Sequence, residues 1–485
     1  MRKILFAFLL ISTSFYAQNY EKNWNTIIEN ENNGKIKSAN AIVAKIHKKA
    51  VADKNEVQII KCFFYESKYL QVVDENAQTK IINNLKTEIN RSSIPSKAIL
   101  NLVYAKCLSE YYNKNRYSIQ NRTLIDSTSS NFLTWTKTDF EKQIQIAYEK
   151  TLENEAILIK TQLINYEAVF DFLTLEKFKE QNLFDYLLKE NINYCISKTG
   201  QWYVNPKEYD VYSKSLLGNS TEFTSLNLEF MKIINLKSVL QLYQKREANN
   251  PSLENQFERI LFCSNTIVKS DDAFLESLNA IQKNTKDELL LQKIQLEKAN
   301  IFAKLASKGI YSDYNVKAIS ILDSIINIKN HSNAFKLAVQ KKQQIKSKTL
   351  QIQLEKFTYA NENTRAFVKY KNVDNLKISF FKINQKMVVN FENRFLKKDS
   401  LLATVINNGK ALQSNKYQFI NKKDYFEYST EVLLPQLETG SYLVYFESDG
   451  DEKNGKAFSY QTITVSDLTV LAYKKYKEEY FQVLN

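Results

Sequence analysis

The side chains that most often carry out chemistry are scarce in this sequence. Two histidines, His47 and His331, occur in 485 residues. His47 stands beside Lys48 and Lys49 at the edge of a predicted helical face, and His331 stands at a predicted helix start. We therefore expect both rings at solvated boundaries rather than in a catalytic site.

The sequence also lacks the short motifs that organise an active site. It contains no HExxH, CxxC, GxSxG or glycine-rich phosphate loop. Metal hydrolysis, thiol redox chemistry, acyl transfer and phosphate binding need such arrangements. Carboxylates are plentiful, yet no spacing singles out a pair for acid–base hydrolysis. We predict that the chain is not an enzyme, and we assign no catalytic, cofactor-binding or metal-binding residue and no cofactor.

The cysteines fit the same interpretation. Cys62, Cys107, Cys195 and Cys263 are far apart in the sequence, and no pair has the spacing of a metal site or a redox motif. The last three lie on apolar stripes with helical spacing, which predicts small buried hydrophobic side chains with inert thiols. A disulfide between distant helices stays open as an alternative.

Charge composition argues against a nucleic-acid partner. Lysine and arginine number 67 against 53 acidic residues, so the formal net charge is +14, yet only eight of the basic residues are arginine. Arginine is the side chain that phosphate and base recognition favours. Lysines also alternate with glutamate and aspartate along the whole chain. We predict no nucleic-acid partner.

The first residues have the pattern of a secretory signal peptide. Met1-Arg2-Lys3 is basic, residues 4–10 are apolar, and Ala17 precedes a polar segment. No later stretch approaches the roughly 20 apolar residues of a membrane span. We predict a signal peptide over residues 1–17 and an exported chain, periplasmic or outer-membrane-associated, that is soluble after cleavage.

Helical periodicity follows over residues 18–348. Apolar residues recur at helical spacing over 39–46, and the same spacing returns over 318–325. Helix pairs with small residues at their contacts predict an irregular, tetratricopeptide-like (TPR-like) α-helical solenoid, which has a concave surface.

Two helix starts are marked by capping residues. Ser93 is followed by Pro95 in the first predicted turn. Thr138 is followed three residues later by Glu141, the spacing of a capping box. We expect helices to begin at both places.

Near residue 349 the hydrophobic period changes to two. Leu376, Ile378 and Phe380 alternate with polar residues, and Gly-containing turn signals separate the strand patterns. We predict one antiparallel β-sandwich over residues 349–470. The predicted fold class is α+β, with the solenoid and the sandwich as separate domains.

Two stretches resemble a known family. One is Leu434-Pro435-x-Leu437-x-x-Gly440-x-Tyr442-x-Val444, and the other is the helical segment 101–112 with Asn115-Arg116, Asn121-Arg122-Thr123, Thr134-Trp135 and residues 170–173. Together they resemble the N-terminal part of Bacteroidetes-type bacterial alpha-2-macroglobulin-like proteins. That part comprises a helical region and a first macroglobulin-like (MG) domain. The resemblance implies a macroglobulin-type sandwich over residues 349–470.

The same resemblance implies a function and its limits. The family is linked to protease inhibition through a cleavable bait, and some members carry a thioester in a CxEQ motif, which is absent here. We expect an exported interaction or scaffold segment with a protein partner, a protease or an envelope protein. We expect residues 471–485 to be the start of a missing next domain or a disordered tail. The alternative is a free-standing periplasmic adaptor that binds a peptide or envelope protein through its helical repeats.

Overall fold

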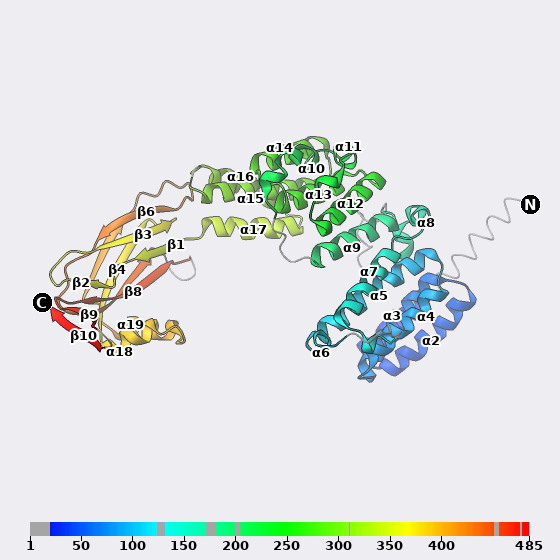
Figure 1. Ribbon diagram of the computed structural model, residues 1–485, viewed down its shortest axis with the longest axis horizontal. Coiled ribbons are helices and arrows are strands. Elements are labelled where there is room, and N and C mark those ends of the chain that lie inside the picture. Colours follow the sequence, from blue (N-terminus) through cyan, green and yellow to red (C-terminus); the bar gives the residue numbers. More distant parts are fainter. Residues whose placement is uncertain are drawn as a thin grey trace, which may run out of the picture. The chain divides into compact units, whose positions relative to one another are not determined.

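The chain is helical first and then forms sheets, as the computed structural model shows (Figure 1). The residues that it describes are 20–123, 131–170, 181–198, 204–309, 311–450, 455–475 and 478–484. The predicted signal peptide lies outside them. Contacts divide the chain into two compact units, Met1–Lys269 and Ser270–Asn485. The predicted α+β class is confirmed.

The first unit is built from helices. Residues 20–32 are helical. The α-helices that follow are α2 (Ile36–Ala52), α3 (Glu56–Val73), α4 (Ala77–Arg91), α5 (Ile94–Lys114), α6 (Arg116–Gln120), α7 (Lys137–Lys150), α8 (Glu155–Lys160), α9 (Leu183–Lys198), α10 (Ser213–Leu216), α11 (Ser220–Thr224), α12 (Ile234–Asn249) and α13 (Leu253–Thr266). Short 3₁₀ turns are η1 (Phe132–Thr134), η2 (Leu163–Tyr166), η5 (Pro206–Glu208), η6 (Asp210–Tyr212) and η7 (Leu228–Phe230).

The capping residues explain where two of these helices begin. Ser93 precedes α5, with proline in the first turn, as predicted. The capping box of α7 is formed by Thr136 and Asp139, so the predicted pair Thr138 and Glu141 was wrong by two residues. Thr136 lies at 5% exposure and its backbone N–H and hydroxyl both donate to the Asp139 carboxylate. A carboxylate in the first turn also complements the helix dipole.

The second unit opens with four helices and continues into the strands. These helices are α14 (Asp271–Asn284), α15 (Glu288–Ser307), α16 (Tyr314–Asn327) and α17 (Asn333–Lys346). The secondary structure changes between α17 and β1, at the predicted position. The division by contacts instead falls after Lys269, because the end of α17 is tied to the sheet. The Asn372 side-chain amide donates to the carbonyls of Ile345 and Ser347, at 3.0 and 3.1 Å.

Among the described residues, the strands form three sheets. They are β1 (Thr349–Gln353), β2 (Phe357–Thr358), β3 (Arg365–Lys371), β4 (Asn375–Ile383), β5 (Gln413–Gln418), β6 (Tyr428–Leu433), β7 (Gly440–Ser448), β8 (Phe458–Val465), β9 (Thr469–Lys475) and β10 (Glu478–Leu484). Their orders are β1-β3-β6, β2-β8-β7-β4-β5 and β10-β9. β9 and β10 form an antiparallel pair that includes much of the predicted tail.

One pairing corrects the prediction of a wholly antiparallel fold. β2 runs parallel to β8, with Phe357 opposite Thr464, so the five-stranded sheet is mixed. The chain leaves β1 in one sheet and crosses directly to the other. β2 therefore meets β8 through a crossover rather than a hairpin, and a crossover permits parallel pairing.

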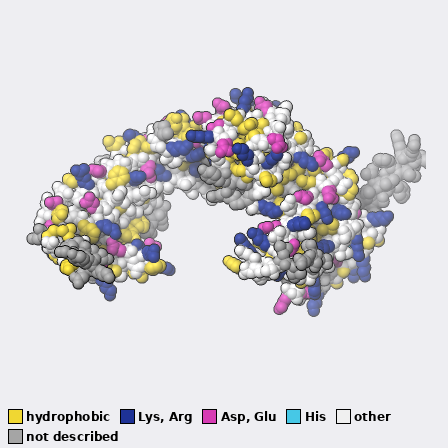
Figure 2. Space-filling view, in the orientation of Figure 1, with side chains coloured by type: hydrophobic (Ala, Val, Ile, Leu, Met, Phe, Trp, Pro, Cys, Tyr) yellow, Lys and Arg dark blue, Asp and Glu magenta, His cyan; other side chains and the backbone are white. Residues whose placement is uncertain are grey.

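The five-stranded sheet is buried on both faces. Ile378 and Phe380 of β4 and Val444 of β7 share one core with residues of the three-stranded sheet. Phe381 and Leu443 point to the opposite face and pack under α18 (Gln385–Glu392) and α19 (Lys398–Asn408). The sequence analysis did not predict these two helices inside residues 349–470. Acidic and basic side chains are interspersed over the visible surface (Figure 2).

Candidate functional site

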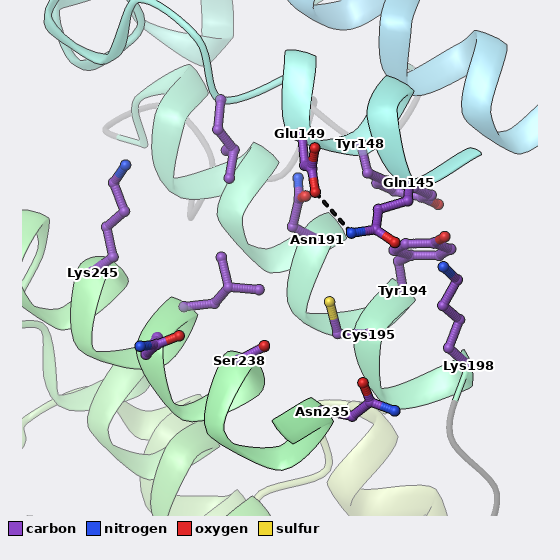
Figure 3. A pocket seen from close by; sticks show the side chains of 13 residues that line it. Gln145, Tyr148, Glu149, Asn191, Tyr194, Cys195, Lys198, Asn235, Ser238 and Lys245 are labelled. Atoms are coloured by element: carbon purple, nitrogen blue, oxygen red, sulfur yellow. Dashed lines mark hydrogen bonds between the residues drawn. The ribbon is translucent and has the colours of Figure 1, made fainter. Parts of the chain in front are cut away.

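A groove of about 350 Å³ lies between α7, α9 and α12 in the first unit (Figure 3). Along each helix the lining residues recur every three or four positions, which places their side chains on one face of the helix. The lining residues are Gln145, Tyr148 and Glu149 of α7, Leu152 in the turn after α7, Asn191, Tyr194, Cys195 and Lys198 of α9, and Asn235, Ser238, Gln241, Leu242 and Lys245 of α12. We call this the α7/α9/α12 groove.

Two stacked tyrosines form one wall of the groove. The rings of Tyr148 and Tyr194 lie 3.8 Å apart between centroids with planes 15° apart (Figure 3). The Lys198 ammonium lies 4.7 Å from the centre of the Tyr194 ring. Burial, with a further contribution from Glu190, raises the pKa of Tyr148 to about 12. Both phenols are therefore neutral at physiological pH and can act as hydrogen-bond donors.

The Tyr194 hydroxyl is the unusual atom of this wall. It is buried and has no hydrogen-bond partner among the described residues. Burial raises the pKa of Tyr194, and the charges of Glu141 and Glu149 raise it further. A buried hydroxyl without a partner loses the hydrogen bonds that water would supply. Its neighbours cover it, so a group that enters the groove can accept from it only when those neighbours move.

Charged and amide side chains surround the tyrosines. The Gln145 amide donates to the Glu149 carboxylate at 2.9 Å, which is the dashed contact in Figure 3. Lys245 pairs with Glu155 at 2.8 Å. The Asn191 amide is used internally, since it donates to the Thr151 hydroxyl at 2.8 Å and to the Leu187 carbonyl at 2.9 Å.

Cys195 lines the groove, but its chemistry is that of a buried thiol. Burial raises the pKa of the Cys195 thiol, and nearby Lys198 opposes this only in part. Cys62, Cys107 and Cys263 also have raised pKa values, with burial as the main cause. All four cysteines lie in the described part of the chain, and none is in a disulfide there. A thiol of raised pKa is a poor nucleophile.

A buried ionic network holds α9 and α12 in place. The Arg246 guanidinium contacts Asp185 of α9 at 3.2 Å and Glu258 of α13 at 2.5 Å. Lys189 of α9 also reaches Glu258, at 2.5 Å, and the Asn255 amide donates to Asp185 at 3.0 Å. Burial alone would raise the pKa of Glu258, but the two cations bring it below its ordinary value. The network fixes two walls of the groove.

A second buried arginine joins the short helices to this layer. Arg259 is fully buried and contacts both oxygens of Glu247, at 2.8 and 3.1 Å. Its remaining N–H groups donate to the carbonyls of Leu216, at 2.6 Å, and Gly218, at 2.9 Å. The guanidinium lies 4.3 Å from the ring centre of Phe223. Its donors are directed at fixed partners, which makes this arginine structural.

The two histidines lie apart from the α7/α9/α12 groove. His47 lines a separate hollow of about 690 Å³ between α2, α3 and α4, and its Nδ1 lies 3.1 Å from the Glu66 carboxylate. His331 precedes α17, and its ring lies 5.3 Å from that of Phe335. Across the ranges given above, no group of three or more His, Cys, Asp and Glu side chains is placed to hold a metal ion.

The buried arginines were the residues that sequence reasoning missed, although a signal exists. In α12 the buried positions Leu236, Val239, Leu240 and Tyr243 continue at the same spacing to Arg246 and Glu247. Charged residues on the buried face of a helix indicate internal ion pairs. The tyrosine stack has no such signal, because α7 and α9 are distant in sequence.

The fold and groove define an α+β protein whose helices form a hollow lined by aromatic, amide and charged side chains. No family model and no curated protein matches the chain. Among solved structures, the chain is similar to part of native alpha-2-macroglobulin from Escherichia coli, in a crystal structure spanning domains MG0-NIE-MG1. The match covers 27% of this chain and 42% of that chain, at 18% identity and a TM-score of 0.19.

This match is weak and partial, and the chain spans less than half of the chain that it resembles. At that TM-score the likeness carries no argument about function. A separate observation concerns membranes: within the described ranges, no helix combines the length and the hydropathy that a bilayer span needs.

Proposed function

We propose that this chain is an interaction segment of an exported alpha-2-macroglobulin-like protein and that its α7/α9/α12 groove binds a protein partner. It acts by binding rather than by catalysis, without a cofactor and without nucleic acid. By the family resemblance, the partner is a protease or an envelope protein.

The observation that carries the proposal is the Tyr194 hydroxyl. An extended or helical peptide brings carbonyl oxygens and amide groups, and a buried phenol without a partner can donate to such a carbonyl. The adjacent Tyr148 ring offers rigid apolar area, and tyrosine is enriched where interfaces derive most of their affinity. Lys198 and Glu149 at the rim suit a partner with both charges.

The macroglobulin part of the proposal rests on the residues that carry the resemblance. Leu434 and Tyr442 lie in the core shared by the two larger sheets. The Tyr442 hydroxyl donates to the Glu438 carbonyl at 2.8 Å and so closes the turn before β7. Pro435 and Gly440 flank the same turn. These positions support an MG-type sandwich over residues 349–470, with a TPR-like helical region before it.

The experiment fills the groove without touching the core. Ser238 lines the groove on α12, and a Ser238→Trp variant would occupy it. Ala248 is exposed on the same helix outside the groove, so Ala248→Trp is a matched control. A benzophenone amino acid at Gln241, in the chain expressed in its native envelope, would crosslink the occupant for mass spectrometry.

We expect the benzophenone at position 241 to form a crosslinked adduct with the occupant of the groove. Ser238→Trp should remove this adduct, and Ala248→Trp should leave it unchanged. An adduct with a protease or with further macroglobulin-type sequence supports the family assignment. An adduct with an unrelated envelope protein instead supports the free-standing adaptor. If Ser238→Trp leaves every adduct unchanged, the groove is not a binding site.

A further inference from the structure

Large apolar side chains are exposed in the connection between α18 and α19 and on α18 beside it. Phe395 is 82% exposed, Val389 is 56% exposed and Leu396 is 42% exposed. The burial of such side chains is favourable in proportion to the apolar area that it removes from water. This feature belongs to the second unit and is independent of the α7/α9/α12 groove. We call residues 393–398 the α18–α19 tip.

The tip is a built turn with defined hydrogen bonds. The Asn393 side-chain oxygen accepts from the backbone N–H of Phe395 at 3.0 Å. The Asn393 carbonyl accepts from the N–H of Leu396 at 3.3 Å, and the Asn393 N–H donates to the Val389 carbonyl. Asparagine commonly organises turns in this way. The turn therefore holds both apolar side chains outward.

The inward face of the same helix pair is anchored. Val388 and Phe391 of α18 and Leu402 and Val405 of α19 are all buried. All but Val388 belong to the cluster that contains Leu443 and Phe381 of the sheet. The two helices thus pack one set of apolar residues against the sheet and leave those of the tip exposed. Packing of the second unit accounts for the packed set but not for the tip.

Basic residues surround the exposed apolar ones. The Arg394 guanidinium lies 5.0 Å from the ring centre of Phe395, and Lys397 and Lys398 follow within the same turn. The nearest acid on α18, Glu392, is paired with Lys356 at 3.2 Å. Figure 2 shows hydrophobic and basic side chains together at the end of this helix pair.

One further acid, Asp399, is the second residue of α19 and is exposed. Its charge contributes, after burial, to the raised pKa of Tyr460 in β8. Residues 393–398 themselves carry apolar and positive side chains and no acid. Lysine is depleted at protein–protein interfaces. Phe and Leu flanked by lysine and arginine are typical of segments that enter the headgroup region of a bilayer.

We propose that the α18–α19 tip is a membrane-contact site that inserts Phe395 and Leu396 into the interfacial region of a bilayer containing anionic lipid. Arg394, Lys397 and Lys398 contact the phosphate groups around them. The site attaches the protein peripherally and goes beyond the proposed partner binding. Charge complementarity favours an anionic lipid surface over a protein partner.

The test uses the full chain and vesicles of phosphatidylcholine with or without phosphatidylglycerol. The double variant F395S/L396S should weaken co-sedimentation with the anionic vesicles about tenfold, because it removes the inserted apolar area. The control is Val211→Ser, which removes an equally exposed (82%) apolar side chain beside Asp210 and should change binding less than about twofold. Both variants keep the apolar residues 4–11, so any binding by that segment cancels.

Two further measurements locate the contact. In Phe395→Trp, the added indole fluorescence should be quenched by lipids brominated along their acyl chains. In K397Q/K398Q, the preference for phosphatidylglycerol should fall while binding to neutral vesicles is unchanged. Equal binding by wild type and F395S/L396S, unquenched indole fluorescence in Phe395→Trp, or an effect of F395S/L396S on a protein partner but not on vesicles would each overturn the proposal.

Discussion

The layer formed by α9, α12 and α13 and the five-stranded sheet are stabilised in different ways. In the helical layer, two arginines and two carboxylates are buried with fixed partners, and a third carboxylate, Glu258, is half-buried. In the sheet, β4 and β7 place apolar side chains on both faces. The helical layer therefore depends on completed polar contacts, whereas the sheet depends on packed volume.

This difference can be measured separately in each region. All three tryptophans, at positions 24, 135 and 202, fall within the first unit. Tryptophan fluorescence therefore follows unfolding of the helical unit, and circular dichroism follows both units. A variant that destabilises the helical unit should shift both signals, whereas one that destabilises the second unit should shift circular dichroism alone.

The largest effect is expected for Arg259→Met. The change leaves the buried Glu247 carboxylate without its partner and removes the donors to the Leu216 and Gly218 carbonyls. Removing one member of a buried ion pair costs about 3–5 kcal/mol of unfolding free energy. Urea denaturation followed by tryptophan fluorescence should show this loss, with little dependence on salt because the pair is buried.

A double variant sharpens that result. E247L/R259M removes the uncompensated charge but still leaves the two carbonyls without donors, so it should recover part of the lost stability. A double variant no more stable than Arg259→Met would mean that the carbonyl contacts carry the effect, and the ionic account of the helical layer would be wrong.

In the sheet the expected loss comes from volume. Leu443 is fully buried beneath α18 and α19. Leu443→Ala should cost about 3 kcal/mol, the usual result of removing a buried leucine side chain. The transition seen by circular dichroism should shift, and that seen by tryptophan should not. Leu433→Ala, at a position 56% exposed in β6, is the matched control and should leave both transitions in place.

Much of the fold could be predicted because its signals are local. Helical periodicity and the change of period near Thr349 identified the order of helices and strands. The α18–α19 pair was missed because each helix is short and lies between strands. Val388 and Phe391, and Leu402 and Val405, are spaced by three, but Asn407-Asn408-Gly409 is one of the Gly-containing turn signals that the sequence analysis interpreted as separating strands. Gly409 in fact ends α19.

The candidate groove could not be predicted from the sequence for a different reason. Its two tyrosines come from α7 and α9, and only the packing of these helices brings their rings together. Their residue types were visible, but nothing local marks Tyr194 as lacking a partner. The parallel pairing of β2 with β8 is likewise a property of the crossover rather than of the two-residue strand.

A smaller effect is expected at the start of α7. Thr136→Ala removes the side chain that caps the helix and that bonds the Asp139 carboxylate at 2.8 Å. Such changes cost about 1–2 kcal/mol. The tryptophan-detected transition should shift, and Thr138→Ala, one residue inside the helix, should have little effect. A larger loss of stability for Thr138→Ala than for Thr136→Ala would instead support the capping box predicted at Thr138.

The smallest effect is expected for the exposed pair His47 and Glu66, which lies in the helical unit but is partly open to solvent. The hydrogen bond that the His47 ring donates to Glu66 raises the pKa of His47 above 6.5, burial opposes this, and the charges of Glu66 and Glu88 add to it. The protonated ring is thus favoured in the folded state. Its contribution is complete below about pH 6.5 and is lost as the pH rises through the folded-state pKa.

The tryptophan-detected stability of the wild type should therefore fall slightly between pH 6 and pH 8, by less than about 1 kcal/mol, because solvent screens a pair this exposed. His47→Gln keeps a polar side chain facing Glu66 and should remove this slope. If the slope of stability against pH is unchanged in His47→Gln, the pH dependence belongs to another group. If the stability lost between pH 6 and pH 8 is instead as large as that caused by Arg259→Met, partial exposure does not weaken ion pairs in this unit.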